Sequence, residues 1–344
     1  MRDRIAAHQV ATGVLAVLAG TPLHQAAVDI GLQPADLADA IEVYRAAGTA
    51  ALHAQTSTRD WYQVRIQFPD WNTAERIAAT HLGPQLQQAQ NTGVLTGWWF
   101  IRKAPCWRLR CRPGPTTTRA DVRAAMTSIL HDLAAADLID GWWESIYEPE
   151  TLAFGGPPGM HFAHDLFHAD SAVILDLLRR HQGAPTTDAV GRRELSILLC
   201  TALFRGAGQE WHEQGDIWHR VTAMRPLPLD IPVHRIGDMT ATLYGLITAD
   251  TTPNGPLFGG PLAFAAAWAA AFAAAGQALG TAARDGALDR GLRDTLAHHV
   301  IFHWNRLGLP ARTQSVLARA TRDTLMNPPA SQPLPSRSAD VART

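Results

Sequence analysis

The sequence predicts an α+β fold, in which a ferredoxin-like β-α-β-β-α-β sheet region precedes a large helical region. Between residues 61 and 148, four stretches with the period of a β-strand alternate with two helical stretches, in the order of a split βαβ unit. From Met160 to Met326 the periodicity is helical. With 344 residues, the chain is long enough for two packed domains or for one large core with an appended module.

The first 55 residues are expected to form a module of short helices. Thr21-Pro22 marks the start of one helix, and Gly31 ends the turn that follows. A second helix is expected to begin at Pro34 and to run to about Ala47. This pattern resembles a helix-turn-helix, but the second helix has more acidic than basic residues, which disfavours binding to DNA. We expect structural packing, or docking of a peptide partner.

The sheet region is predicted in detail. The strands are expected at 61–68, 96–103, 106–112 and 141–148, and the two helices at 73–90 and 119–136. The second and third strands are joined by Ala104-Pro105.

Three arginines, Arg108, Arg110 and Arg112, share one face of the third strand. Unpaired charges are costly to bury, so three explanations stay open for this face. It is solvated, it pairs with carboxylates such as Glu144 and Glu148, or it binds an anionic or amide-rich ligand.

The helical region is expected to contain helices at about 159–181, 190–205, 208–221, 261–283, 287–304 and 310–326. An uncharged stretch from Thr251 to Ala283 has the length of a membrane span but is rich in Ala, which favours a helix buried among other helices. The predicted domains are residues 1–55, a catalytic domain 56–326, and a disordered Pro/Ser-rich tail 327–344.

Composition excludes several classes of protein. The net charge is -1 and Lys103 is the single Lys, so the chain lacks the basic stripe of nucleic-acid-binding proteins. The N-terminus has no apolar signal segment, and three Cys residues show no metal-ligand spacing. We therefore expect a reduced cytoplasmic protein that contacts neither nucleic acid nor membrane.

Two further groups of residues could carry chemistry. His161, His164 and His168 share one helix face, but the HExxH motif is absent, so packing or acid–base roles are favoured over a metal site. The doublets Trp98-Trp99 and Trp142-Trp143 could stack on a flat ligand, and we expect one Trp of each pair to lie in the core.

Four segments in family order resemble the C-terminal elimination domain of lantibiotic dehydratases and the split enzymes of thiopeptide biosynthesis. They span about 210 residues and are WWFIRK…WRLR (98–110), IYEPE…FGG (146–156), LFHADS (166–171) and HWNRLGL (303–309). This resemblance implies a mixed α/β fold and a ribosomally made precursor peptide as the partner.

Two branches of enzymes share that fold. Elimination enzymes expel glutamate from glutamylated Ser or Thr, and pyridine synthases join two dehydroalanines in a formal [4+2] aza-cycloaddition, followed by loss of water and the leader peptide. Elimination enzymes typically have an Arg where this chain has Ala153, and a His where it has Ile301. The resemblance therefore favours a cofactor-independent pyridine synthase, with tRNA-glutamate-dependent elimination and non-catalytic binding of the precursor as alternatives.

The resemblance and the chemistry of the side chains together give a set of candidate site residues, of which Arg108, Arg110, Glu150, His303, Asn305 and Arg306 match the family. Glu150 and His303 are the acid–base candidates, with Tyr147 and Tyr244 as proton donors. The substrate-binding candidates are Arg108, Arg110, Trp98, Trp142, Phe154, Asp170, Ser171, Asn305 and Arg306. No metal and no cofactor are expected. The expected partner is a dehydrated, azole-containing precursor peptide that still carries its leader. A homodimer is possible.

Overall fold

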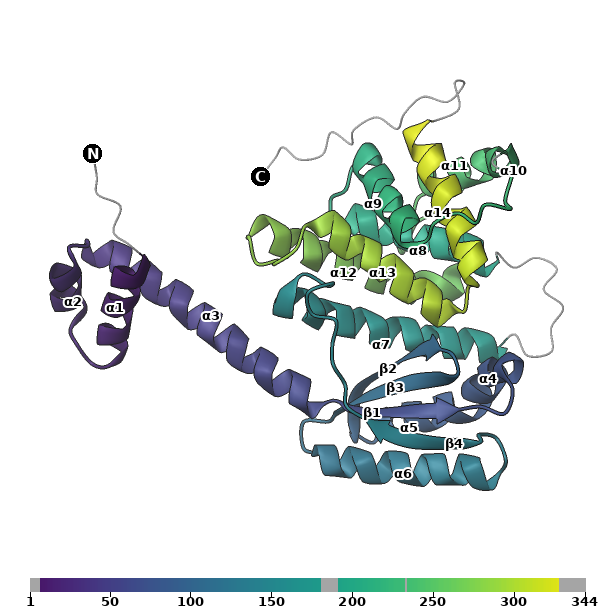
Figure 1. Cartoon of the computed structure of the whole chain (residues 1–344), viewed down its shortest axis with the longest axis horizontal. Helices are drawn as coiled ribbons and strands as arrows, with labels where there is room; N and C mark the ends of the chain where they lie inside the picture. The colour runs from purple at the N-terminus through teal and green to yellow at the C-terminus, as the bar shows by residue number, and fades with distance from the viewer. Residues whose placement is uncertain (1–6, 181–190, 233, 328–344) are drawn as a thin grey trace. The chain divides into compact units, whose positions relative to one another are not determined.

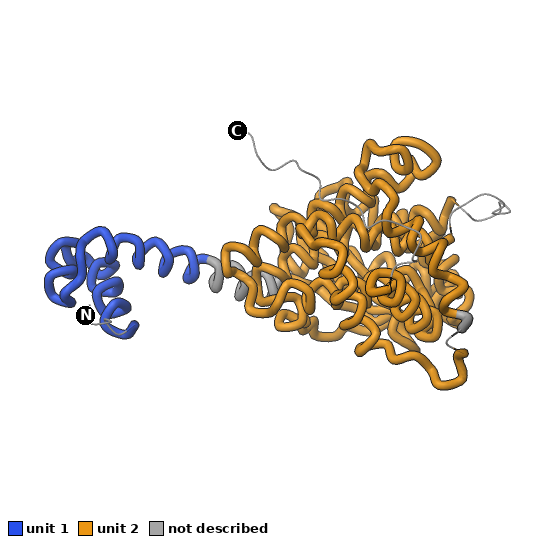
Figure 2. The backbone as a smooth tube through the Cα atoms, turned by 90° about the horizontal axis from the view of Figure 1, so that it is seen from above, with its two compact units in different colours: residues 1–59 blue, residues 60–344 orange. Residues whose placement is uncertain are grey.

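The computed structural model describes residues 7–180, 191–232 and 234–327, and only the backbone of residues 50–60 and 234–235. It divides into two compact units, residues 1–59 and 60–344 (Figure 2). Residues 328–344, which make up nearly all of the predicted tail, lie outside the described residues.

The first unit is built from three helices, α1 (Ala7–Leu18), α2 (Leu23–Ile30) and α3 (Pro34–Asp60). Its small core is formed by Val14, Ala26, Ala27, Leu37 and Ile41. Gly31 adopts the left-handed conformation after α2, a common helix end. The third helix is longer than predicted, because it continues past Gly48, and one Gly alone costs only about 1 kcal/mol.

The second unit begins with a four-stranded antiparallel sheet of order β2-β3-β1-β4, as the predicted ferredoxin-like topology requires (Figure 1). Its strands are β1 (Tyr62–Gln67), β2 (Leu95–Lys103), β3 (Cys106–Pro113) and β4 (Gly141–Ser145). The predicted fold class is thus confirmed. The last strand ends at Ser145, three residues earlier than predicted. Ser145 pairs with Gln63, and β1 begins at Tyr62, so the residues after Ser145 have no strand to pair with.

One face of the sheet is covered by the two crossover connections. The first contains α4 (Trp71–Ile77), a π-helical turn η1 (Ala78–Leu82) and α5 (Gly83–Asn91), and the second is α6 (Arg119–Ala135). The side chains buried between strands and helices include Val64, Leu109, Met126 and Leu130. This layer forms part of the main hydrophobic core.

Helix α7 (Gly156–Arg180) contacts the edge strand β2 through side chains that bond to its backbone. Ser171 Oγ accepts a hydrogen bond from the Phe100 N–H at 3.2 Å. His168 Nδ1 lies within hydrogen-bonding distance of both the N–H and the carbonyl of Trp98. These bonds satisfy backbone groups that a bare edge strand would expose.

The remaining helices form a layer above the sheet (Figure 1). They are α8 (Arg192–Gly206), α9 (Trp211–Met224), α10 (His234–Gly237), α11 (Thr240–Thr248), α12 (Ala266–Arg284), α13 (Leu292–Leu307) and α14 (Ala311–Met326). Helices α10 and α11 were not predicted, since they are too short for a clear periodic pattern.

Helix α12 continues a short 3₁₀ turn, and in the described part of the chain the segment Ala263–Arg284 is the one helix long and apolar enough to cross a membrane. It packs on α7 and α8. A Cβ on Gly276 would overlap the Leu203 carbonyl oxygen, and one on Gly280 would lie 2.8 Å from that of Ala207. These glycines therefore let the helix backbones approach closely on one side, while the segment as a whole is only partly buried, less than the sequence predicts.

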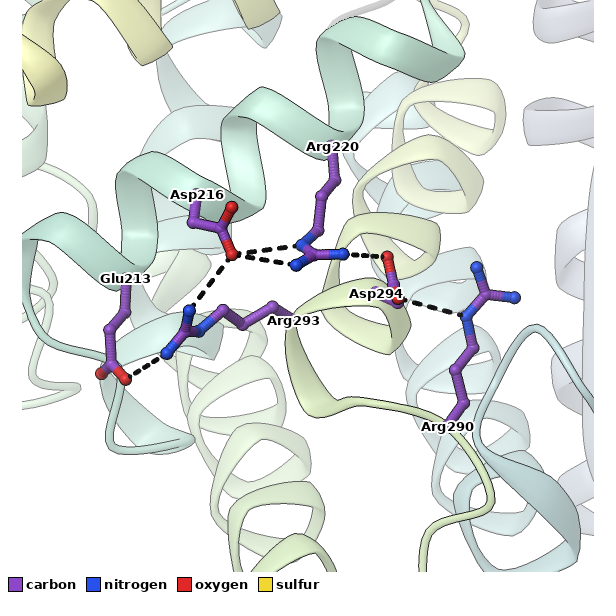
Figure 3. Close-up of polar contacts among 6 residues, drawn as sticks. All are labelled: Glu213, Asp216, Arg220, Arg290, Arg293 and Asp294. Carbon is purple, nitrogen blue, oxygen red and sulfur yellow. Dashed lines mark hydrogen bonds and ion pairs between the residues drawn. The ribbon is translucent and has the colours of Figure 1, made fainter.

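Helices α9 and α13 are joined by a network of ion pairs (Figure 3). Arg220 binds Asp294 at 2.6 Å and also binds Asp216, which in turn accepts a hydrogen bond from Arg293 at 3.2 Å. Glu213 and Arg290 extend the network at its two ends. The side chains are partly exposed, so each pair contributes little alone, but together they align the two helices.

Candidate functional site

The face of the sheet opposite α6 carries four arginines, Arg65, Arg108, Arg110 and Arg112, which we call the arginine face. Arg65 and Arg108 are direct cross-strand neighbours. Among the described side chains, Arg65, Arg108 and Arg110 have no carboxylate within ion-pair distance, and Arg112 lies 3.7 Å from Asp165. So many like charges on one face favour an anionic or amide-rich ligand.

The predicted pairing of this face with the carboxylates of the fourth strand does not occur. Glu144 points to the opposite side and binds Arg123 of α6 at 2.6 Å. Glu148, beyond the end of β4, is exposed. Of the three explanations that the sequence left open, internal pairing with Glu144 is thus wrong.

Arg110 is the buried member of the arginine face, with 2% of its surface exposed. Its Nε donates to Gln63 Oε1 at 2.7 Å, and its guanidinium lies 4.1 Å from the centre of the Trp99 ring. Burial lowers the pKa of Arg110 to about 10, which still leaves it charged at neutral pH. Its Nη1 has no hydrogen-bond partner among the described residues, so one buried N–H₂ group is available to a ligand.

Tyr147 and His164 form a buried polar pair beside Arg110. The Tyr147 hydroxyl lies 2.7 Å from His164 Nε2, and the ring of Tyr147 lies 5.1 Å from the Arg110 guanidinium. Burial, with nearby positive charge, lowers the pKa of His164 to about 3, and burial raises the pKa of Tyr147. Both groups are therefore neutral near pH 7, flanked by Trp61 and Trp99.

An aromatic cluster lies next to this pair and is centred on Phe154. Phe154 contacts Phe167 of α7 and His299 and Phe302 of α13. The two glycines after it have positive φ, and a Cβ on Gly156 would overlap the Asp289 carboxylate. The double glycine is therefore required by the turn that leads Phe154 into the cluster.

Asp170 is the centre of a fully buried cluster of polar groups. It accepts hydrogen bonds from Arg306 Nε at 2.7 Å and Trp268 Nε1 at 2.9 Å, and lies 3.0 Å from His303 Nδ1. Burial alone would raise the pKa of Asp170, but the attraction of His303 and Arg306 and their hydrogen bonds hold it below its usual value. The sequence motifs LFHADS and HWNRLGL thus meet at this point.

Polar atoms of this cluster stay without partners among the described residues. They are Nη1 and Nη2 of Arg306 and Nε2 of His303. His299 nearby has neither ring nitrogen hydrogen-bonded, and its burial lowers its pKa to about 3. Arg306 stacks on Phe167 at 4.3 Å, which connects the Asp170 cluster to the aromatic cluster.

Arg110 and Tyr147 lie together, and Trp99 connects them to Phe167, which packs on both Phe154 and Arg306. Arg306 in turn binds Asp170, which lies beside His303. Arg108 lies on the arginine face beside Arg65. Glu150 is exposed, but its charge acts on both Arg110 and Tyr147. Ser171 serves the edge strand, and Asn305 accepts from Gln314 of α14 at 3.1 Å. Tyr244 lies on α11 against Trp211, in the helical layer.

The tryptophan doublets divide as strand alternation dictates. Trp98 and Trp142 lie on the side of α6, where Trp142 packs on His131. The partner of Arg110 is Trp99, so the substrate-stacking role predicted for Trp98 and Trp142 does not fit the arginine face. Gln63 was not predicted as a site residue, and the choice of Trp99 over Trp98 depends on the register of β2 with β3, in which Trp99 is the partner of Arg110.

The three histidines of α7 have separate partners. His164 bonds to Tyr147, His168 to the Trp98 backbone and to Gln90, and His161 lies 3.7 Å from Asp165. Within residues 7–180, 191–232 and 234–327, no three His, Cys, Asp or Glu side chains gather as a metal site.

The comparisons with known proteins agree with this architecture. The sequence model for the C-terminal region of lantibiotic biosynthesis dehydratases matches residues 61–325. Among curated proteins, none matches the chain.

Similar solved structures include the tRNA-dependent lantibiotic dehydratase MibB from Microbispora sp. 107891, with 21% identity, a TM-score of 0.56, and coverage of 76% of this chain but 28% of MibB. TsrL has 17% identity and a TM-score of 0.53, with 76% of this chain and 94% of TsrL covered. The pyridine synthase TbtD, from thiomuracin biosynthesis, has 14% identity and a TM-score of 0.49, with 77% and 97% covered. The first two likenesses show a shared fold.

Proposed function

The chain belongs to the lantibiotic biosynthesis dehydratase C-terminal family, and on that premise we propose that it forms a pyridine ring in a ribosomally made precursor peptide. The reaction is a formal [4+2] cycloaddition between two dehydroalanine residues. One amide tautomerises to an iminol, two carbon–carbon bonds form, and loss of water and of the leader peptide as an amide makes the ring aromatic. No net oxidation or reduction is involved.

The observation that supports this reaction best is the neutral pair Tyr147–His164. Tautomerisation of an amide needs a proton donor and a proton acceptor close together, without the formation of a stable charge. A phenol and an imidazole that share a 2.7 Å hydrogen bond supply both. The surrounding Trp61 and Trp99 are themselves buried and keep water away from the pair.

Two substituted positions support the same proposal. Ala153 packs on the aromatic cluster, and Ile301 is buried in the main core. The resemblance implies that elimination enzymes use an Arg and a His at these positions. His299, whose pKa is lowered to about 3 by burial, is a poor base for removal of an α-proton at neutral pH.

Glutamate elimination is the second candidate, favoured by one observation. The unpaired guanidinium groups of Arg65, Arg108 and Arg110 form a surface that suits a departing carboxylate. Under the first proposal the same groups hold the carbonyl oxygens of the precursor.

Incubation with a dehydrated linear thiopeptide precursor, followed by mass spectrometry, separates the candidates. Pyridine formation gives a macrocycle and a free leader peptide. A glutamylated precursor that loses glutamate would instead establish elimination, and binding without any change of mass would identify a non-catalytic partner of the precursor.

A further inference from the structure

Trp143 lies on the arginine face, at the edge of the sheet. In the order β2-β3-β1-β4, β4 is an edge strand, and its Trp143 is the direct partner of Arg65 of β1. Arg65 is in turn the partner of Arg108 of β3. Directly opposite residues of antiparallel strands share a face, with Cβ atoms about 4.5–5.5 Å apart. The three side chains therefore form one row across three strands, which we call the edge row.

The next row on the same face is closed by internal hydrogen bonds. It contains Arg110, Gln63 and Ser145, and the Gln63 amide bonds to the other two side chains. Arg110 and Gln63 are both buried. In the edge row, by contrast, the two arginines are partly exposed, and Trp143 has 42% of its surface exposed. A ligand that reaches the arginine face from solvent therefore contacts the edge row.

The groups of the edge row have room for such a ligand. Among the described side chains, neither Arg65 nor Arg108 has a carboxylate within ion-pair distance, and Arg65 Nε is buried without a hydrogen-bond partner. The Trp143 ring belongs to neither of the two hydrophobic clusters that the described residues of the second unit form. Gly141 lies two residues earlier on the same face, and a Cβ there would meet nothing within 4 Å. The indole therefore has free space beside it.

The chemistry of the edge row selects a planar ligand with an acceptor oxygen. An exposed indole offers a flat π-face for stacking. A guanidinium group is planar as well, stacks on rings and donates hydrogen bonds to carbonyl and carboxylate oxygens. Two cations without carboxylates repel a cationic ligand, and an aliphatic group would use neither flat surface. The edge row thus suits an aromatic ring that carries a carbonyl or carboxylate oxygen.

We propose that the edge row is a subsite for such a ring, which stacks on Trp143 while its oxygen is bound by Arg65 and Arg108. That the ring belongs to the precursor peptide rests on the proposed function. Tyr147 follows Trp143 by four residues, so their Cα atoms lie at most about 14 Å apart. A short extended peptide spans this distance. Trp143 is therefore a specificity-determining residue, which selects the part of the substrate that is presented to Tyr147 and His164.

The test uses the full chain with ¹⁵N-labelled tryptophan and three small probes. Benzoate has a planar ring and a carboxylate, cyclohexanecarboxylate has the same charge without a planar ring, and benzylammonium has the ring with the opposite charge. The Trp143→Phe variant identifies the Trp143 indole signal by its loss. Benzoate is expected to shift this signal with a millimolar Kd, as a ligand of few atoms should. Cyclohexanecarboxylate is expected to bind about 2- to 10-fold more weakly, and benzylammonium not measurably.

Variants connect the affinity for benzoate to the stacking surface, with Kd measured by ligand-observed NMR. Trp143→Ala is expected to raise Kd by about 2- to 10-fold, whereas Trp143→Phe retains a flat ring and is expected to bind nearly like the parent. Trp71→Ala is the matched control. Trp71 is equally exposed, at 43%, but lies at the start of α4, so this variant is expected to bind benzoate like the parent.

On a dehydrated precursor, Trp143→Ala is expected to raise KM by about 2- to 10-fold with kcat within a few-fold of the parent, because the lost contact lies outside the reacting groups. Equal affinity for benzoate and cyclohexanecarboxylate would overturn the proposal, as would an equal loss of affinity in Trp71→Ala. A Trp143 signal that shifts with protein concentration and not with benzoate would place a second copy of the chain on the indole and would also overturn it. Absence of ring formation with an intact benzoate response would refute the proposed function and still support the subsite.

Discussion

Asp170 and Arg306 form an ion pair that is completely removed from solvent. Their oxygen and nitrogen lie 2.7 Å apart, and neither side chain has exposed surface. They belong to α7 and α13, and the two residues are 136 positions apart in the chain. The pair therefore joins two helices of the core and also sets the position of the Arg306 Nη groups.

The first prediction concerns this pair. Asp170→Asn is expected to lower the free energy of unfolding by about 3–5 kcal/mol, because it leaves the Arg306 charge buried without a counter-ion. Urea unfolding followed by circular dichroism measures the change. Asp176→Asn, which breaks a partly exposed pair with Arg179, is the control and is expected to cost about 1 kcal/mol or less. Equal losses in the two variants would contradict the buried-pair interpretation.

A second prediction follows from the pair Tyr147–His164. Tyr147→Phe retains the ring contacts with Trp61 and Trp99 and removes only the hydroxyl. We expect the rate of macrocycle formation to fall by about 10²- to 10⁴-fold, the usual contribution of acid–base groups. Single-turnover kinetics on a dehydrated precursor measure it.

Tyr244→Phe decides between the two donors that the sequence suggested. Its position on α11 against Trp211 predicts a rate within a few-fold of the parent. If this variant lost as much activity as Tyr147→Phe, the site would have to extend to α11.

Stability is expected to depend on pH through two buried histidines. The pKa values of His164 and His299 are lowered to about 3 in the folded chain, mainly by burial, against about 6.5 when unfolded. Below pH 6.5 the unfolded chain therefore binds protons that the folded chain does not, so stability is present above pH 6.5 and is lost as the pH falls towards 3.

Each histidine adds a slope of up to about 1.4 kcal/mol per pH unit in this range. Asp170, whose pKa is also lowered, adds to the loss only below about pH 4, in the same direction. Urea midpoints at pH 7, 6 and 5 measure the slope. The His299→Leu variant is expected to show a smaller slope, and an unchanged midpoint from pH 7 to 5 in the parent would refute the assignment.

The sequence was sufficient for the sheet because local patterns determine it. Alternation in 61–68 and in 106–112 located β1 and β3, and the order of elements implied their pairing. The end of β4 depends on its partner, since β1 begins at Tyr62 and gives the residues after Ser145 nothing to pair with. The end of β4 is therefore determined by its tertiary contacts and cannot be predicted from a local sequence pattern.

The candidate site was predictable only in part for a similar reason. The motif residues Asp170, His303 and Arg306 meet in one buried cluster, although their motifs lie far apart in the sequence. Strand alternation shows that the side chains of Trp98 and Trp99 lie on opposite faces of the sheet. It does not show which of the two shares a face with the arginines. The bond between Tyr147 and His164 connects an irregular segment to a helix, a relation that no periodicity encodes.

The last prediction concerns the contact of α12 with α8. Gly276→Ala is expected to lower the free energy of unfolding by about 1–3 kcal/mol or more, because its methyl group would overlap the Leu203 carbonyl and force two packed helices apart. Gly245→Ala is the matched control, since its Cβ on α11 would meet nothing within 4 Å. There the substitution is expected to stabilise the chain by up to about 1 kcal/mol through helix propensity. Urea unfolding of both variants measures the difference, and Gly276→Ala with parental stability would show that α12 and α8 pack less closely than described.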